Sequence, residues 1–515
     1  MKHRAVMGIE LGSTRIKAVL VDDRAEVLAQ GSYEWENRLV DGVWSYDLED
    51  VWEGLRVSFR NLNEEYRARY GEPITELEAM GVSAMMHGYL AFDGSGELLV
   101  PFRTWRNTMT ERSARELSEL FQFNIPQRWS VAHFDQAVLN GEAHVTQVAF
   151  LTTLAGYVHE RLTGKRVLGV GDASGMFPIR DGDYDAERLV LFNERLRAHG
   201  IERSFESMLP QVLSAGEDAG VLTEEGARLL DPTGTLRAGC RLCPPEGDAG
   251  TGMVATASIA PRTANVSAGT SAFLMAVLER PLSRYYEEID VVTTPTGDPV
   301  AMVHVNNFTS EINAWMSLFE EIAALSGGMD RGALFDAAFR ASREGDAECG
   351  GLMGYNFLSG EHIVGVSEGR PMIARRPDGA LTLANFMKMQ IYSALSTLSI
   401  GMDILRQERV TLDSVCGHGG FFKTPEVGQS AMSAALGAPI TVMQNAGEGG
   451  AWGVALLALF ASDPESSLDR FLHRIFCDAE KLTVSADEAE QKDFARFAVR
   501  YRQALPMERQ AAEYI

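Results

Sequence analysis

Two segments of the chain each combine an apolar run, a glycine turn with hydroxyl side chains, and a second apolar run, which is a β-hairpin pattern. They are Gly8–Asp22 and Ala264–Val277, about half a chain length apart. Glycine lets backbone N–H groups approach an anion, and Ser and Thr add donors, so such a turn can hold phosphate. Two copies facing each other could grip one polyphosphate. The pattern predicts an ATP-dependent phosphotransferase.

The first copy also carries charged residues. Glu10 ends the first apolar run and could hold Mg²⁺, usually through water, while Lys17 could reach phosphates from the adjacent strand. For either hairpin alone, a glycine that merely permits the turn is the simpler interpretation. The repetition favours phosphate binding. The predicted phosphate-binding residues are Gly12, Ser13, Thr14 and Lys17 in the first copy and Gly269, Thr270 and Ser271 in the second.

Asp248 lies between glycines in the run Pro244–Gly252, just before an apolar stretch that predicts a helix over 253–258. Phosphoryl transfer to an alcohol needs a carboxylate that accepts the hydroxyl proton, and flanking glycines would let a substrate approach. Asp is also a common helix N-cap. Spacing alone leaves both interpretations open.

Three further motifs are candidate binding elements. Gly417, Gly419 and Gly420 would give a flat surface for a purine or ribose, or else a strand-to-helix turn that needs small residues. Met86-His87 follows a strand and could contact a polyol, and Trp105 could face a sugar ring. Alternatively, His87 is a turn histidine whose hydrogen bonds stay within the protein, and Trp105 is a partly buried aromatic anchor. The small residues of Glu448–Gly453 indicate close helix packing.

The pattern of apolar residues predicts an α/β protein with a mixed sheet in each half. We expect two directly packed domains, 1–257 with the sugar site and catalytic base and 258–515 with the nucleotide site, and a cleft between them. The second is expected to end in a C-terminal helix. Helical spacing is found at 48–69, 107–121, 144–162, 310–325, 331–342, 382–407 and 485–505.

Composition excludes several classes of function. The 515 residues carry a net charge of −24 with a pI near 4.9, which argues against nucleic acid and anionic membranes as partners. The longest apolar stretches are too short to span a bilayer, so we expect a cytoplasmic protein. Five cysteines fit a reducing compartment, and Cys240 and Cys243 are expected to be core or loop thiols. The P-loop and protein-kinase motifs are absent from the sequence.

Taken in order, these motifs resemble the FGGY carbohydrate kinases of the actin/hexokinase/heat-shock-protein-70 ATPase superfamily. The resemblance implies two ribonuclease-H-like domains with ATP and sugar in the cleft. It makes Asp248 the catalytic base and Met86-His87 a sugar-contacting pair typical of xylulose kinases. The residues that carry it are Gly8–Asp22, Gly81–Gly88, Pro101–Asn107, Leu162–Gly164, Gly171–Ser174, Gly247-Asp248, Gly269–Ser271 and Gly417–Gly420.

Three positions depart from the family pattern and leave the sugar open. Glu10 stands where Asp is usual, Ala249 where Asn or Gln is found in xylulose- and glycerol-type members, and Asn107 where an acidic residue is common. We expect ATP-dependent phosphorylation of a terminal hydroxyl of a small ketose, most simply a pentulose such as xylulose. Mg²⁺ would be held near Glu10 and Asp248. The resemblance also suggests a homodimer.

Other functions remain open from the sequence. A ribulose, other ketose or polyol kinase would use the same motifs. A nucleotide-gated binding or assembly protein would share the ATPase core, because actin and the chaperone do. A catalytically weak sugar and ATP sensor would fit the replacements at Glu10 and Ala249.

Overall fold

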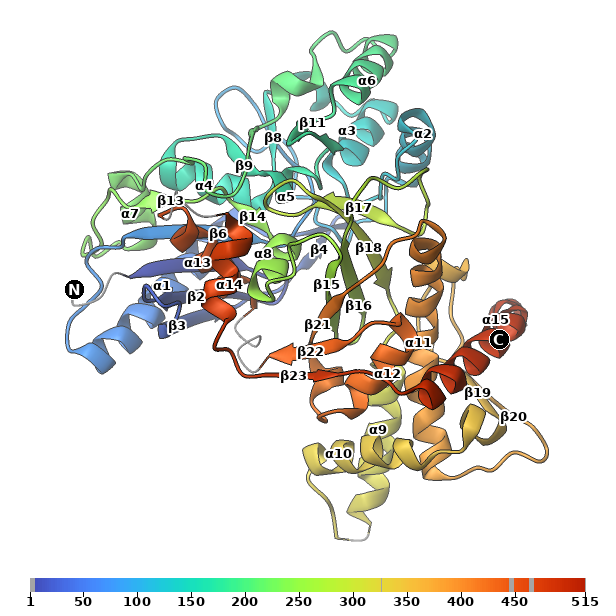
Figure 1. Ribbon diagram of the computed structural model, residues 1–515. Coiled ribbons are helices and arrows are strands. Elements are labelled where there is room, and N and C mark those ends of the chain that lie inside the picture. The colour runs from blue at the N-terminus through green and yellow to red at the C-terminus, as the bar shows by residue number, and fades with distance from the viewer. Residues whose placement is uncertain (1–4, 326, 444–448, 463–466, 515) are drawn as a thin grey trace.

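The computed structural model describes residues 5–325, 327–443, 449–462 and 467–514, and it has a mixed sheet in each half of the chain (Figure 1). The first sheet has the order β13-β6-β1-β2-β3, with β14 also paired to β6. Its strands are β1 (Val6–Leu11), β2 (Arg15–Val21), β3 (Val27–Glu34), β6 (Ala79–Ala84), β13 (Arg241–Leu242) and β14 (Glu246–Gly247).

The second sheet repeats the centre of the first. Its order is β17-β18-β16-β15-β21-β22-β23. In each sheet an antiparallel hairpin, β1–β2 or β15–β16, has a parallel strand on the outer side of its first strand, which is β6 or β21. The strands are β15 (Thr263–Ala268), β16 (Ala272–Val277), β17 (Asp290–Thr293), β18 (Pro299–Val305), β21 (Ser414–His418), β22 (Ile440–Met443) and β23 (Lys481–Val484).

Helices cover these sheets, and side-chain alternation explains how. In β1, Met7, Ile9 and Leu11 join one core with α1, whereas Val6 joins the core on the opposite face. The helices are α1 (Leu48–Tyr70), α2 (Glu111–Phe121), α3 (Ser130–Leu139), α4 (Leu154–Thr163), α5 (Val170–Ala173), α6 (Ala186–Ala198), α7 (Glu224–Leu230), α8 (Asp248–Ala255), α9 (Ser310–Ala324), α10 (Arg331–Ala341), α11 (Leu383–Gln407), α12 (Val427–Leu436), α13 (Gly449–Phe460), α14 (Leu468–Phe476) and α15 (Glu488–Tyr514).

Helix α13 comes from the second half of the chain and packs on the first sheet. In Figure 1, α13 and α14 lie among the blue and green elements of the first half. A Cβ added at Gly8 would lie 1.9 Å from the Ala451 carbonyl, and one at Gly81 would lie 2.6 Å from a Val454 methyl. Glycine in these strands therefore allows the helix to approach closely. The domain boundary at 257/258 stays a prediction. Helix α13 follows that boundary in sequence but returns to pack on the first sheet.

The helix predicted over 144–162 is confirmed only in its second part. The span 144–162 divides into a short 3₁₀ turn (Val145–Gln147), strand β8 (Phe150–Thr152) and helix α4. Strand β8 pairs with β7 (Leu90–Phe92), and the Thr153 side chain then caps α4 by accepting from Gly156 N. Two β-branched threonines and this cap favour a strand followed by a helix start over a continuous helix. The predicted stop at Gly164 is confirmed, with φ +76°.

Candidate active site

Asp248 is the first residue of α8, directly after β14. Its Oδ1 accepts hydrogen bonds from the backbone N–H groups of Met86 (3.1 Å) and Ala249 (3.0 Å). The cap residue of α8 is Gly247, so Asp248 does not serve as the N-cap. Its side chain is exposed to solvent, yet the surrounding protein raises its pKa above the usual range for Asp. This is a carboxylate that is held in place and remains reachable.

Glu10 lies near the end of β1, where it pairs across the hairpin with Lys17 and across the parallel ladder with Ser83. The N–H of Ala451, near the start of α13, donates to Glu10 Oε2 at 3.2 Å. Burial raises the Glu10 pKa to about 7, with a further increase from the nearby charge of Asp248, while Lys17 opposes it. The structure thus brings Glu10, Lys17 and Asp248 into one electrostatic group.

Two more carboxyl groups lie beneath Asp248, and the sequence analysis missed both. Glu246 accepts from the N–H groups of Gly171 (3.2 Å) and Asp172 (2.9 Å), and Asp172 Oδ2 accepts from the Thr153 hydroxyl at 2.6 Å. Burial raises the pKa of Asp172 to about 7 and that of Glu246 to about 8. The charge of Asp248 adds to the shift of Asp172, and the charge of Asp172 adds to that of Glu246. Both groups favour protonation near neutral pH, which limits the negative charge behind Asp248.

A local signal for Glu246 does exist in the sequence. A Cβ at Gly169 would lie 2.2 Å from Glu246 Oε1, and one at Gly171 would lie 2.4 Å from Oε2. The Gly169-x-Gly171 pair therefore makes room for a buried carboxyl group. Only the fold shows which side chain fills that space.

The predicted sugar-contacting residues Met86 and His87 lie next to Asp248. Met86 and His87 are buried, and His87 has φ +72° with Nδ1 3.5 Å from the Gly175 carbonyl. Burial, and secondarily the charge of Arg128, lowers the pKa of His87 well below its usual value, which favours neutral imidazole. Because Met86 N also binds Asp248, this turn links the predicted sugar residues directly to the predicted base.

Trp105 is 39% exposed, and its Nε1 donates to Ser13 Oγ at 3.3 Å. This bond joins the predicted sugar contact to the first glycine turn. Asn107, in contrast, is buried and bonds the backbone N and O of Trp44, so its amide shapes the loop. The replacement of an acidic residue at this position is thereby explained.

The predicted nucleotide residues form two groups. In the first hairpin, Gly12 N donates to Arg15 O at 3.0 Å, which leaves Thr14 exposed at the tip. In the second, Gly269 N donates to Ser271 O at 2.9 Å, and Thr270 is exposed.

The turn Gly417–Gly420 packs against the second hairpin. Gly419 has φ +106°, and a Cβ there would lie 2.4 Å from the Ala268 carbonyl, so this position requires glycine. Gly420 faces open space, whereas Gly417 lies under the Phe422 ring. The structure therefore brings the second hairpin and the glycine turn together. Glu448, predicted at the start of the small-residue run, lies outside the described residues.

The donor set suits Mg²⁺ held largely by water and phosphate. Within the described residues, no three His, Cys, Asp or Glu side chains form a metal-holding group. Mg²⁺ commonly uses one or two carboxylates together with waters and substrate phosphates. Glu10 and Asp248 are two such groups, and each keeps access to solvent.

Family models match most of the chain. Residues 5–233 match the N-terminal domain, and residues 264–462 the C-terminal domain, of the FGGY family of carbohydrate kinases. The chain belongs to this family. It is therefore an ATP-dependent sugar kinase, which decides against the assembly-protein alternative. None of the helices in the described ranges is long and apolar enough to cross a membrane.

Known sugar kinases are similar to this chain over nearly its full length. Xylulose kinase from Escherichia coli K12 is 23% identical over 521 residues, covering 97% of this chain and 99% of its own. The crystal structure of ligand-bound xylulose kinase from Lactobacillus acidophilus gives a TM-score of 0.79 at 14% identity, covering 98% of both chains. Gluconate kinase from the same organism gives 0.80 at 15% identity, also covering 98% of both. The two-domain actin-like fold is thus confirmed.

Proposed function

We propose that this kinase phosphorylates a terminal hydroxyl of a small ketose, most simply a pentulose such as xylulose. The observation that carries the proposal is the hydrogen bond from Met86 N to Asp248 Oδ1, which places the predicted base beside the predicted sugar-contacting turn. The names of the full-length relatives, xylulose kinases, support the pentulose. A cytoplasmic location and a homodimer stay predictions.

Asp248 would act as general base through Oδ2, since both of its backbone hydrogen bonds fall on Oδ1. The sugar oxygen attacks the γ-phosphorus of ATP, its proton passes to Asp248, and the bond to the bridging oxygen breaks to release ADP. A raised pKa makes the carboxylate a stronger base near neutral pH. Protonation of Asp172 and Glu246 would limit charge repulsion around it.

Glu10 and Lys17 would organise the phosphate side of the reaction. Mg²⁺, when bound, would neutralise phosphate charge, and Glu10 together with Asp248 would hold it, partly through water. Lys17 lies opposite Glu10 in the hairpin and would add positive charge toward the phosphates. The glycine turns at Gly12 and Gly269 would supply backbone donors for the charge that develops during transfer.

The test is ADP release with Mg·ATP across ketoses, polyols, aldoses and gluconate, with Asp248→Asn beside the wild type. We expect a response to one or two ketoses and a loss of about 10²–10⁴-fold in kcat for the variant, because a general base is removed. ATP binding by calorimetry should remain. Asp378→Asn changes an exposed carboxylate in the same way and should be active. Activity of Asp248→Asn within a few-fold of wild type would refute the assignment of the base.

The same panel separates the alternatives. Turnover on ribulose, glycerol or gluconate would move the substrate assignment within the kinase class. Binding of a sugar by calorimetry with negligible turnover on every compound would favour the sensor. Its motivating observation is Glu10, whose pKa of about 7 leaves it partly protonated at neutral pH before any cation binds.

A further inference from the structure

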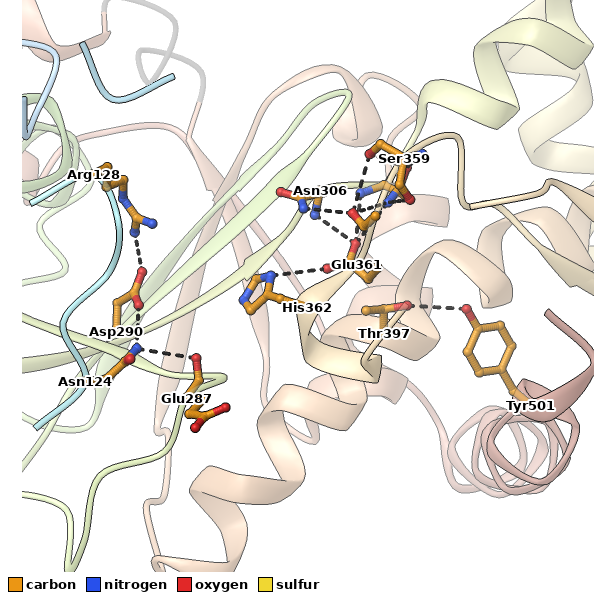
Figure 2. Close-up of polar contacts among 12 residues, drawn as sticks. Asn124, Arg128, Glu287, Asp290, Asn306, Ser359, Glu361, His362, Thr397 and Tyr501 are labelled. Atoms are coloured by element: carbon orange, nitrogen blue, oxygen red, sulfur yellow. Dashed lines mark hydrogen bonds and ion pairs between the residues drawn. The ribbon is translucent and has the colours of Figure 1, made fainter. Parts of the chain in front are cut away.

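The edge strand β17 of the second sheet contacts the first domain at both of its ends. At one end, the Thr293 hydroxyl donates to Val170 O (2.9 Å), and Thr293 N donates to Ser174 Oγ (3.1 Å). At the other end, the Asp290 carboxylate receives hydrogen bonds from the Arg128 guanidinium and from Asn124 Nδ2, the latter at 2.9 Å. Figure 2 shows Asn124 and Arg128 converging on Asp290.

The Asp290 contact is well shielded from water. The side chain of Asp290 is 12% exposed and that of Arg128 is 22% exposed. Asn124 Nδ2 also lies within hydrogen-bonding distance of the Ile289 carbonyl, at 3.1 Å. A charge-assisted pair with such limited exposure fixes geometry more firmly than a surface ion pair does.

The backbone that carries Arg128 holds the predicted sugar-contacting turn. Arg128 O accepts from Gly88 N at 3.1 Å, and the Ser130 hydroxyl donates to Gly88 O at 2.6 Å. Between them, the Trp129 ring stacks on His87, with centroids 6.2 Å apart and an interplanar angle of 19°. Three consecutive residues therefore support His87 and Gly88.

This support matters because the turn has an unfavourable backbone conformation. His87 has φ +72° and Gly88 has φ +103°. A non-glycine residue in the left-handed region persists only when its surroundings determine it. The orientation of His87 thus depends on segment 128–130, and the Arg128 side chain is tied to the second domain.

The second domain also approaches His87 through its own sheet. His304 of β18 stacks on Phe273 of β16, with centroids 4.1 Å apart. Burial lowers the pKa values of His87 and His304, the charge of Arg128 lowers both further, and His304 makes a smaller contribution at His87. Arg128 therefore lies between a predicted sugar residue of one domain and the facing sheet of the other.

We propose that Asp290 is a positioning residue for the acceptor sugar: by holding Arg128, it sets the His87–Gly88 turn according to the place of the second domain. The inference rests on the proposed function, in which His87 contacts the sugar. Asp290 itself reaches the site only through Arg128. Sugar binding would consequently report whether the two domains are correctly seated.

The test compares Asp290→Ala and the milder Asp290→Asn with Thr293→Val. The control removes a hydrogen bond from the same strand and the same domain contact, but at the end away from Arg128. We expect Asp290→Ala to raise the KM for sugar about 10-fold, because a hydrogen bond between charged groups is lost. Asp290→Asn should give a smaller rise. The KM for ATP and the intrinsic ATPase rate should stay within about 2-fold, as should every constant of Thr293→Val.

Two further measurements separate positioning from general loosening. The pair Arg128→Met/Asp290→Ala should be no worse than Asp290→Ala alone, since both changes break one link. Hydrogen exchange of the Gly88 amide, which donates to Arg128 O, should be faster in Asp290→Ala than in Thr293→Val or wild type. Melting temperatures show whether each variant is folded.

The outcomes are distinct. An unchanged KM for sugar in Asp290→Ala, a higher KM in the double variant than in Asp290→Ala, or an equal rise in Thr293→Val would each overturn the proposal. If the wild type phosphorylates no sugar, the proposed function fails, yet the exchange of the Gly88 amide still decides whether Asp290 controls the turn. Unchanged exchange there would reject the link itself.

Discussion

The hairpins β1–β2 and β15–β16 occupy equivalent places in their sheets but carry different side chains. In the first, Glu10 pairs with Lys17; at the same distance from the turn in the second, Ser267 pairs with Phe273. The parallel neighbours differ as well, with Ser83 beside Glu10 and His418 beside Ser267. The first hairpin thus places a carboxyl group opposite a lysine, whereas the second carries an uncharged pair. The two hairpins share a backbone arrangement, but the charged residues predicted to act on phosphate and metal lie in the first one.

The strongest test of this difference removes the carboxylate charge from the first hairpin. Glu10→Gln should lower kcat or the affinity for Mg²⁺ about 10- to 100-fold, as is typical for a residue acting around a metal. Ser267→Ala, at the matching position, should leave both within about 2-fold. Kinetics at varied Mg²⁺ concentration measures the difference. Equal losses of kcat or Mg²⁺ affinity in the two variants would show that both hairpins contribute equally to Mg²⁺-dependent catalysis.

A second prediction concerns the glycines in and beside the two hairpins. Gly419→Ala should destabilise the protein by about 1–3 kcal/mol, because φ is +106° and the new Cβ meets the Ala268 carbonyl. Gly420→Ala faces open space and serves as the matched control. In the first hairpin, the nearest atom to a Cβ at Gly12 is Arg15 O at 3.1 Å, so Gly12→Ala should cost less. Unfolding in denaturant measures the loss of stability in each of the three variants, which should be largest for Gly419→Ala.

A third prediction is a pH dependence of stability from the carboxyl groups of the first domain whose pKa values are raised. Burial raises the pKa of Glu246 to about 8 and those of Glu10 and Asp172 to about 7, so the folded protein binds more protons than the unfolded chain. Stability should therefore fall as pH rises from about 5 to about 8, by at most about 1.4 kcal/mol per pH unit for each group.

Melting temperatures at pH 5.5 and 8 check this sign. Glu246→Gln should make the fall between the two pH values smaller than in wild type, because one titrating group is removed. Glu225→Gln, which changes an exposed carboxyl group, should keep the wild-type difference. A fall of the same size in all three proteins would mean that Glu246 does not titrate in this range.

Local patterns predicted much of the fold because they depend on neighbours in sequence. The helix over 48–69 is confirmed as α1, where Asp47 caps the start and Gly71 ends it with φ +83°. The helix over 382–407 is confirmed as α11. Strand β8 was missed because its strand character comes from pairing with β7, which is remote in the sequence.

The site divides in the same way. Asp248 was identified because glycines flank it in the sequence, and its role as a base stays a prediction. Asp172 and Glu246 were missed because their importance comes from burial beneath Asp248, which only the tertiary structure creates. Gly8 and Gly81 did carry a signal, since glycine inside a strand indicates close approach of other backbone. That signal does not say which helix approaches.

The return of α13 to the first sheet has a consequence for synthesis of the chain. Glu10 accepts a hydrogen bond from Ala451, so the predicted metal site is completed by a residue that is synthesised 441 positions later. At roughly 5–20 residues per second, the ribosome needs on the order of 10–40 seconds to proceed from residue 257 to that point. Until then, helix α13 is not present to pack over Gly8 and Gly81 of the first sheet. Premature termination anywhere before α13 would therefore yield a fragment that lacks one side of the predicted metal site.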